Sequence, residues 1–222
     1  MFAGEVFFIE PMVAVVGFSV KVVVMKRRLY TPLFLILSSI PVEAQTRDAA
    51  VPVFVITPKE STIKFYVKAS VDLTGVFDKW DATLTYASTD ATVGVLDVQI
   101  QAATVNSGSH MKDGKLKSKD FFNVEQDPLI TFKSTKMVQT GPETFDVPGI
   151  FTIRGVSKPE TLALTLFGKG TGSGAVKGQM VFDRKDYGMT KGIPLIKIAD
   201  RVEVNVDLKV KRVSGPALVF KE

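Results

Sequence analysis

Apolar and polar residues alternate with a period of two along most of the chain after Val53, the pattern of β-strands that bury one face. The run from Val202 to Val210 is the clearest, because five apolar residues there alternate with Glu, Asn, Asp and Lys. The same alternation predicts five further strands, at residues 62–68, 96–102, 130–133, 162–166 and 180–182.

Turn-forming residues separate these runs, at 57–60, 88–90, 140–143 and 168–174. Only residues 107–123 break the alternation, with a lysine-rich stretch that has weak helical character from His110 to Lys119, although Gly114 disfavours a helix. Strands at this spacing predict an all-β fold, an antiparallel barrel of about eight strands with one short helical or loop insertion. A closed sheet is favoured because closure removes exposed strand edges.

The first 44 residues differ from the rest. Three basic residues at 26–28, a short apolar stretch at 29–40 and the small residues Val42 and Ala44 predict a secretory signal peptide over 25–44, cut after Ala44. The stretch is too short for a membrane span, which needs about 20 apolar residues. Residues 6–24 could be read as a membrane anchor, but Glu10 and Pro11 argue against a span.

A signal peptide is built around its own first methionine, so we interpret residues 1–24 as an upstream extension of a protein that starts at Met25. The expected organisation is then a linker at 45–52, a barrel at 53–213 and a C-terminal tail at 214–222. The expected location is the periplasm or the medium, after cleavage near Ala44.

Composition removes several classes of function. The chain has no cysteine and one histidine, which excludes disulfides, thiolate chemistry and metal sites built on several imidazoles. The net charge of +5 is spread along the chain, without the basic clusters and interleaved aromatics of a nucleic-acid-binding face. This charge leaves a transient contact with anionic membranes open.

Four polar features are candidates for chemistry, each with a plainer interpretation. His110 lacks a recognisable nucleophile or orienting carboxylate, so an exposed loop histidine is favoured. The lysines between 112 and 119 could hold a diphosphate head group, but spacing alone favours a solvated connection. The glycines at 168–174 are read as a flexible turn, and the charges at 183–186 as a surface hairpin.

Aromatic residues are frequent at the apolar positions of the alternating pattern, for example Phe65, Phe132 and Phe182 on three different predicted strands. A small barrel can fill itself with such side chains, or it can leave room for one ligand. Composition does not separate these two outcomes.

Ordered motifs over 61–210 resemble the YceI-like family, secreted bacterial proteins with a lipocalin-like barrel that binds polyisoprenoid lipids. They include STIKF at 61–65, GVF at 75–77, LKSKDFF at 116–122, PLITFKS at 128–134, GVSKP at 155–159 and DRKDYGM at 183–189. The resemblance implies a lipocalin-like antiparallel β-barrel and a periplasmic or secreted protein that sequesters or carries an isoprenoid-chain lipid. The lipid would be a polyprenyl phosphate or an isoprenoid quinone.

The resemblance and the alternation together predict which side chains contact the lipid inside the barrel. They are Ile63, Phe65, Val67, Phe77, Trp80, Leu84, Phe121, Phe122, Ile130, Phe132, Phe151, Ile153, Leu162, Leu164, Leu166, Met180, Phe182, Tyr187, Met189, Val204 and Val206. We expect an elongated apolar tunnel along the barrel, with the head group near residues 107–123. No catalytic residue, metal or cofactor other than the lipid is expected, and the oligomeric state, a homodimer included, stays open.

The chain departs from the family pattern at two positions where relatives often carry a histidine, here Ala69 and Lys115. If those histidines contact a head group, this chain prefers a different one. Two rival interpretations remain, an enzyme that acts on a lipid inside the barrel and a structural barrel with a solid core. The almost wholly apolar inward positions argue against the enzyme.

Overall fold

The computed structural model describes residues 51–193 and 195–222. The predicted upstream extension, the signal peptide and the first six residues of the predicted linker lie outside this part of the chain. No helix within it is long and apolar enough to cross a membrane.

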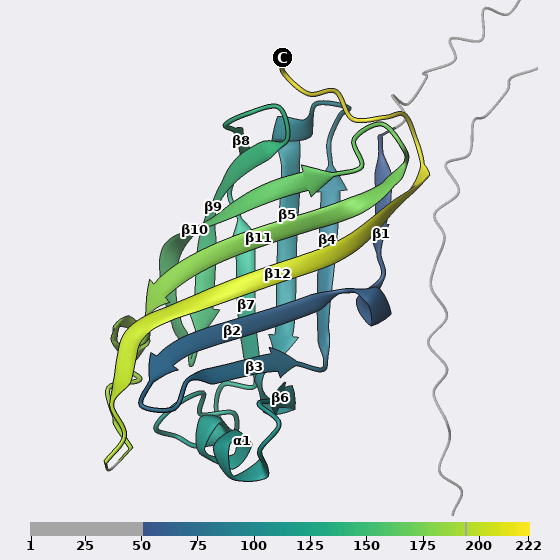
Figure 1. Ribbon diagram of the computed structural model, residues 1–222. Coiled ribbons are helices and arrows are strands. Elements are labelled where there is room, and N and C mark those ends of the chain that lie inside the picture. Colours follow the sequence, from purple (N-terminus) through teal and green to yellow (C-terminus); the bar gives the residue numbers. More distant parts are fainter. Residues whose placement is uncertain (1–50, 194) are drawn as a thin grey trace, which may run out of the picture. The chain divides into compact units, whose positions relative to one another are not determined.

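The described residues form one antiparallel sheet that curls around an apolar core (Figure 1). Its strands are β1 (Val53–Ile56), β2 (Thr62–Ala69), β3 (Leu73–Phe77), β4 (Trp80–Tyr86), β5 (Gly94–Gln101), β6 (Val105–Asn106), β7 (Leu129–Ser134), β8 (Val138–Gln139), β9 (Thr144–Ile153), β10 (Val156–Phe167), β11 (Ser173–Asp183) and β12 (Ile198–Ser214). The helix α1 spans His110–Lys117, and short 3-10 turns lie at η1 (Pro58–Glu60), η2 (Ala91–Val93), η3 (Ala102–Thr104) and η4 (Arg184–Tyr187).

The all-β prediction is confirmed, but the described sheet has twelve strands rather than about eight. The additions are short segments such as β6 and β8, two residues each, which are too short to show an alternation in sequence. The main path runs β4-β5-β7-β9-β10-β11-β12-β2-β3-β6, while β1 pairs with β12 and β8 with β9.

The expected full closure is not seen, since within the described residues no ladder joins β4 to β6, the two ends of the main path. The connection between β3 and β4 closes this corner instead. The backbone N–H of Asp78 donates to the Thr104 carbonyl at 3.1 Å, and the N–H of Lys79 donates to Thr104 Oγ1 at 3.0 Å. These bonds satisfy edge groups that a ladder would otherwise pair.

The predicted alternation becomes burial on every long strand. Ile63, Phe65 and Val67 of β2 are buried between exposed or half-buried neighbours. On β12 the phase is as predicted, yet Val204 and Val206 are only half-buried. The strand pattern therefore fixes which side chains point inward, and the interior decides how tightly they are packed.

The segment at 107–123 contains the one helix of the described chain, α1, close to the stretch with helical character. Asp113 fixes the turn before it, because its Oδ1 accepts bonds from the Ser107 N–H at 2.8 Å and the Ser107 hydroxyl at 2.6 Å. These bonds lower the pKa of Asp113, the Ser107 hydroxyl contributing most. The helix forms despite Gly114, where a β-carbon would meet no atom within 4 Å, so no close packing requires glycine at this position.

Residues 214–222, the expected tail, lie against the barrel end opposite α1 (Figure 1). Val219 forms a bridge with Asp90, and the Phe220 ring lies 6.2 Å from that of Phe145. Gln139 bonds both backbone groups of Lys221, at 2.8 and 2.9 Å. The segment thus contributes to the cover of this end.

Candidate functional site

An apolar cavity of about 380 Å³ lies inside the sheet at the end covered by α1, and we call it the wide chamber. Its size is within the range of pockets that hold small molecules, roughly 300–1,000 Å³. It is lined by Ile63, Phe65, Val67, Ala69, Val71, Leu73, Phe77, Ile100, Met111, Lys112, Lys115, Leu116, Phe121, Phe122, Ile130, Phe151, Ile153, Phe182, Arg184, Met189, Ile193, Ile196, Ile198, Val202 and Val204.

One wall of the wide chamber is a cluster of three phenylalanine rings. Phe65 lies 5.7 Å from Phe77 and 6.2 Å from Phe122, between ring centroids. Gly75 makes room for this cluster, because a β-carbon there would stand 2.4 Å from the Phe65 ring. A larger residue at 75 would push the ring into the chamber.

A second aromatic cluster, Phe151, Phe182 and Tyr187, supports another part of the wall, with centroids 5.1–5.4 Å apart. Tyr187 is fully buried and its hydroxyl donates to Glu160 Oε1 at 2.9 Å. Burial, with the Glu160 contact, raises the Tyr187 pKa well above its usual value. Tyr187 therefore backs the rings that line the chamber and does not line it.

The rim of the wide chamber is built by three loops far apart in sequence: the β2–β3 turn, the segment containing α1, and the connection from η4 to β12. Arg184 holds the last of these, with its side chain buried. It donates to the carbonyls of Met189, Lys191 and Ala199 and pairs with Asp200 at 3.0 Å. The predicted surface hairpin at 183–186 is therefore wrong for Arg184, which lies inside.

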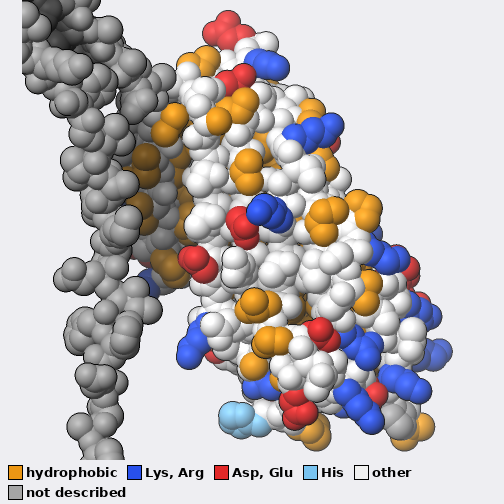
Figure 2. Space-filling view, turned by 180° about the vertical axis from the view of Figure 1, so that it is seen from behind, with side chains coloured by type: hydrophobic (Ala, Val, Ile, Leu, Met, Phe, Trp, Pro, Cys, Tyr) orange, Lys and Arg blue, Asp and Glu red, His pale blue; other side chains and the backbone are white. Residues whose placement is uncertain are grey.

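Lysine side chains mark the α1 side of the rim. Lys115 Nζ lies 2.8 Å from Asp120 Oδ2 and 5.6 Å from the centroid of the Phe121 ring, which itself lines the chamber. This hydrogen bond lowers the pKa of Asp120, and the charges of Lys115, Lys119 and Lys191 lower it further. Blue side chains gather on the lower part of the molecule in Figure 2, the end where Figure 1 shows α1.

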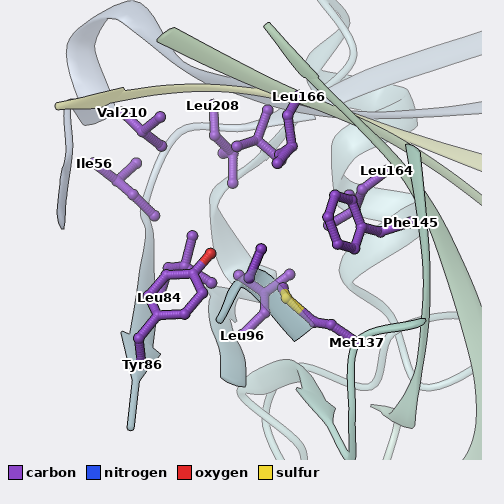
Figure 3. Close-up of a pocket in the computed structure, with 12 residues that line it drawn as sticks. Ile56, Leu84, Tyr86, Leu96, Met137, Phe145, Leu164, Leu166, Leu208 and Val210 are labelled. Atoms are coloured by element: carbon purple, nitrogen blue, oxygen red, sulfur yellow. The ribbon is translucent and has the colours of Figure 1, made fainter. Parts of the chain in front are cut away.

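The opposite end holds a second apolar space of about 20 Å³, which we call the packed end. It is lined by Ile56, Leu84, Tyr86, Ala91, Leu96, Met137, Phe145, Leu164, Leu166, Val176, Leu208 and Val210. Figure 3 shows the labelled side chains reaching it from several elements. Burial raises the Tyr86 pKa well above its usual value. A space of this size admits about one water molecule and no lipid chain.

A layer of buried side chains separates the two spaces, and we call it the waist. On β5 the order is Leu96 at the packed end, then Val98, then Ile100 in the wide chamber. Phe132 fills the same level on β7, with its ring against Gly149, where a β-carbon would stand 2.6 Å away. The waist consists of Ala82, Val98, Phe132, Val147, Leu162 and Met180, all buried.

The structure divides the predicted lipid-contacting residues between these regions. Those in the wide chamber are Ile63, Phe65, Val67, Phe77, Phe121, Phe122, Ile130, Phe151, Ile153, Phe182, Met189 and Val204. The remainder line the packed end (Leu84, Leu164, Leu166), form the waist (Phe132, Leu162, Met180) or pack elsewhere against the core (Trp80, Tyr187, Val206). In place of the expected elongated tunnel the structure has two unequal spaces, with the buried side chains of the waist between them.

Several lining residues were missed from the sequence. The connection at 190–200 carries no charge cluster, yet Ile193, Ile196 and Ile198 all line the chamber. The sequence signal that could have found them is the close spacing of these isoleucines in a segment that also contains Gly and Pro. Ala69 and Lys115, the two departures from the family pattern, both lie in the chamber wall.

The other candidate features match their plainer interpretations. His110 is exposed as expected, although it is the first residue of α1 and does not lie in a loop. Residues 168–172 form a turn with glycines at positive φ. In the described part of the chain, no three His, Cys, Asp or Glu side chains are grouped to hold a metal ion.

Comparison with known proteins agrees with this architecture. A family model described as the YceI-like domain matches residues 54–210. A UPF0312 protein of Azotobacter vinelandii is 29% identical over 126 residues, which cover 54% of this chain and 66% of that protein. This chain therefore spans just under two thirds of that relative's length.

Solved structures share the fold. The crystal structure of Burkholderia cenocepacia BcnA superposes with a TM-score of 0.64 at 22% identity, over 70% of this chain and 99% of that one. A domain from Saccharophagus degradans, described as polyisoprenoid binding and implicated in plant cell wall breakdown, gives a TM-score of 0.57 at 16% identity. That match covers 72% of this chain and 99% of that domain. Likeness at these identities establishes the architecture.

Proposed function

Because the chain belongs to the family of YceI-like domains, we propose that it is a binding protein that holds the isoprenoid chain of a lipid in the wide chamber. The lipid class is a polyprenyl phosphate or an isoprenoid quinone, and the role is to sequester or carry it. The Saccharophagus degradans domain, described as polyisoprenoid binding, has the same fold and supports the proposal.

The observation that carries the proposal is the chamber itself, which combines about 380 Å³ of space with a wall of apolar side chains. A solid-core barrel would not leave this space in its interior. An empty apolar volume forfeits contacts that packed side chains would make, so an apolar occupant stabilises it. Half-buried Val204 and Leu73 face this space and supply the surface that a lipid chain would cover.

Affinity for a long apolar chain does not require polar contacts. Burying one methylene group contributes about 0.8 kcal/mol, while large ligands rarely exceed about 0.3 kcal/mol net per heavy atom. A chain of about 25 carbons then gives about 7.5 kcal/mol, which corresponds to a dissociation constant in the low micromolar range. The head group would lie at the rim.

A catalytic function finds less support in the chamber. Among the described residues, its wall contains no histidine, carboxylate or hydroxyl side chain, the groups that act most often as acids, bases or nucleophiles. Binding without turnover is the simplest use of such a wall. We further propose export through the predicted signal peptide at 25–44, with the mature chain beginning near Gln45 in the periplasm or outside the cell.

The test is extraction of protein purified gently from a bacterial periplasm with organic solvent, followed by mass spectrometry. An isoprenoid-chain lipid is expected in amounts close to one per chain. Stripped protein should then bind polyprenyl phosphates or isoprenoid quinones at micromolar concentrations. N-terminal sequencing of the same sample should begin at Gln45 or within a few residues of it.

A matched pair of variants locates the site. Val204→Phe fills part of the wide chamber and should weaken binding, while Lys64→Phe on the outer face of β2 should leave it unchanged. Absence of extractable lipid together with no binding of either class would overturn the proposal. A lipid recovered chemically altered after incubation would identify an enzyme instead.

A further inference from the structure

We infer that the wide chamber selects a lipid with an anionic head group, a phosphate or diphosphate held by Lys112 and Lys115 at its rim. The inference deepens the proposed function and rests on it. It chooses the polyprenyl phosphates over the neutral quinones.

The argument begins with the polar groups that a ligand meets in the chamber. Of the described lining residues, the only ones with polar side chains are Lys112, Lys115 and Arg184, and all three are cations. The lining side chains therefore offer a head group cationic donors and no acceptor, and the carboxylate of Asp120 lies behind Lys115 as its partner. An anion can satisfy such donors fully, and hydrogen bonds with both partners charged are stronger than neutral ones.

Arg184 is not free to serve as the head-group site. Its guanidinium already donates to three backbone carbonyls and to Asp200. Turning the guanidinium toward a ligand would break these bonds, which hold the connection from η4 to β12 in place. Arg184 thus organises the rim, and the two lysines are left to meet the ligand.

Lys112 and Lys115 are placed to act together. They are three residues apart on α1, a spacing that puts side chains on one face of a helix. Lys115 Nζ lies beside the Phe121 ring at the chamber wall, so its charge stands at the boundary between apolar interior and rim. An apolar chain inside would bring its head to this boundary.

The ion pair between Lys115 and Asp120 does not by itself explain why several lysines gather at this rim. The charges of Lys119 and Lys191 also act on Asp120, so more than one lysine shares this carboxylate. The side chains of Lys115 and Asp120 are 40% and 30% exposed, and an ion pair at that exposure contributes little to stability. The unbalanced positive charge at this rim is complementary to a phosphate.

The experiment compares two ligands with the same chain, farnesyl phosphate and farnesol, on the full chain stripped of lipid. Affinities are measured by displacement of an apolar fluorescent dye at low salt. Farnesyl phosphate should bind at least about tenfold more tightly, and the ratio should shrink as salt rises, because exposed charges are screened beyond about 8 Å at 0.15 M ionic strength.

Variants then assign the preference to the two lysines. Lys112→Met/Lys115→Met keeps long apolar stems and should bring the ratio close to one without weakening farnesol. The control Lys64→Met/Lys211→Met removes the same charge from exposed positions on β2 and β12 and should keep the ratio. Asp120→Asn removes the competing carboxylate and should tighten farnesyl phosphate by about threefold while leaving farnesol unchanged.

Each other outcome has a definite meaning. Equal binding of the two ligands by the unmodified protein would overturn the head-group inference and leave the proposed function standing. So would equal weakening of both ligands in the Lys112/Lys115 variant. Displacement of farnesyl phosphate by inorganic phosphate at similar concentrations would identify a free-phosphate site instead of a lipid head-group site. Failure of both ligands to bind would overturn the inference and the proposed function together.

Discussion

Strands β5, β9, β11 and β12 carry apolar side chains into both ends of the barrel, yet one end encloses about 380 Å³ and the other about 20 Å³. β5 shows the difference on a single strand: Leu96 lies in the packed end, and Ile100, four residues later, faces the wide chamber. Both residues are buried leucine or isoleucine side chains. What differs is the structure on the opposite side.

The packed end is closed by segments that bring large side chains inward. Ile56 of β1, Tyr86 of β4, Met137 before β8 and Phe145 of β9 meet there, as Figure 3 shows. The C-terminal segment adds Phe220, whose ring lies against Phe145. Side chains from these segments leave only about 20 Å³ between them.

The wide end is bounded by loops, whose side chains surround the space without crossing it. Val71 and Ile196 come from two loops and Met111 from α1, and each is exposed. The two aromatic clusters stay within the walls. A ligand-sized space therefore depends on what the covering segments leave unfilled, and an apolar strand face is compatible with either outcome.

The largest expected effect comes from a charge in the waist that divides the two ends. Phe132→Asp buries an unpaired carboxylate at the waist and should lower the free energy of unfolding by about 3–5 kcal/mol or more. Thr131→Asp, on the outer phase of the same strand, should cost less than about 1 kcal/mol. Chemical denaturation measures both, and equal losses would mean that the inward register is wrong by one residue.

A matched truncation at each end tests the difference in packing. Leu164→Ala removes contacts in the packed end and should cost about 3–5 kcal/mol of unfolding free energy. Leu73→Ala, facing the wide chamber, should cost only about 1–2 kcal/mol, because Leu73 already has empty space on one side. Urea denaturation of lipid-free protein measures the pair, and a larger loss for Leu73→Ala would reverse the assignment of the two ends.

Enlarging one side chain at each end sharpens the same contrast. Val176→Phe overfills the packed end and should destabilise the protein by about 1–3 kcal/mol, with little effect on lipid affinity. Val204→Phe should be accommodated by the wide chamber with a change in stability within about 1 kcal/mol, but it should weaken lipid binding about tenfold or more. Titration and thermal unfolding of both variants separate the effects. Unchanged lipid affinity in Val204→Phe would remove the wide chamber from the binding site.

The smallest expected effect is the dependence of ligand affinity on pH, through the carboxylates that stabilise the rim. Hydrogen bonds hold the pKa values of Asp113, Asp120 and Asp200 below the usual range, from Ser107, Lys115 and Lys185 respectively. A carboxyl group with a lowered folded-state pKa stabilises the fold above its ordinary pKa of about 3.9, and that contribution is lost as the pH falls through the lower, folded value.

Farnesol has no ionising head group of its own, so any change in its affinity with pH reports on the protein. Its affinity should be constant from about pH 5 to pH 8 and fall a few-fold near pH 3. Amide hydrogen exchange should show faster opening of the rim loops than of the packed end under the same acid conditions. Equally fast exchange at both ends would argue that the rim carboxylates do not cause the loss of farnesol affinity in acid.

The site could be predicted from sequence only in part, for reasons visible in particular residues. Phe65 and Phe182 were found because a period of two marks inward positions on long strands. Ile193 and Ile196 were missed because they lie in a loop, where no period applies. Arg184 was predicted to be exposed because a charged residue is buried only when specific partners surround it. Its acceptors include the carbonyls of Lys191 and Ala199, and no sequence pattern links those residues to Arg184.

The sequence by itself determined the all-β class, the inward phase of each long strand and the family, because alternation and ordered motifs are local properties of the chain. Only the tertiary structure decided that Leu164 packs at one end while Phe151 lines a chamber at the other, with Phe132 between them. Whether a given apolar side chain meets another side chain or an empty space depends on elements that arrive from elsewhere in the chain. The C-terminal segment helps to cover one end, and the rim segments leave space at the other, so the same hydrophobic alternation produced both a core and a cavity.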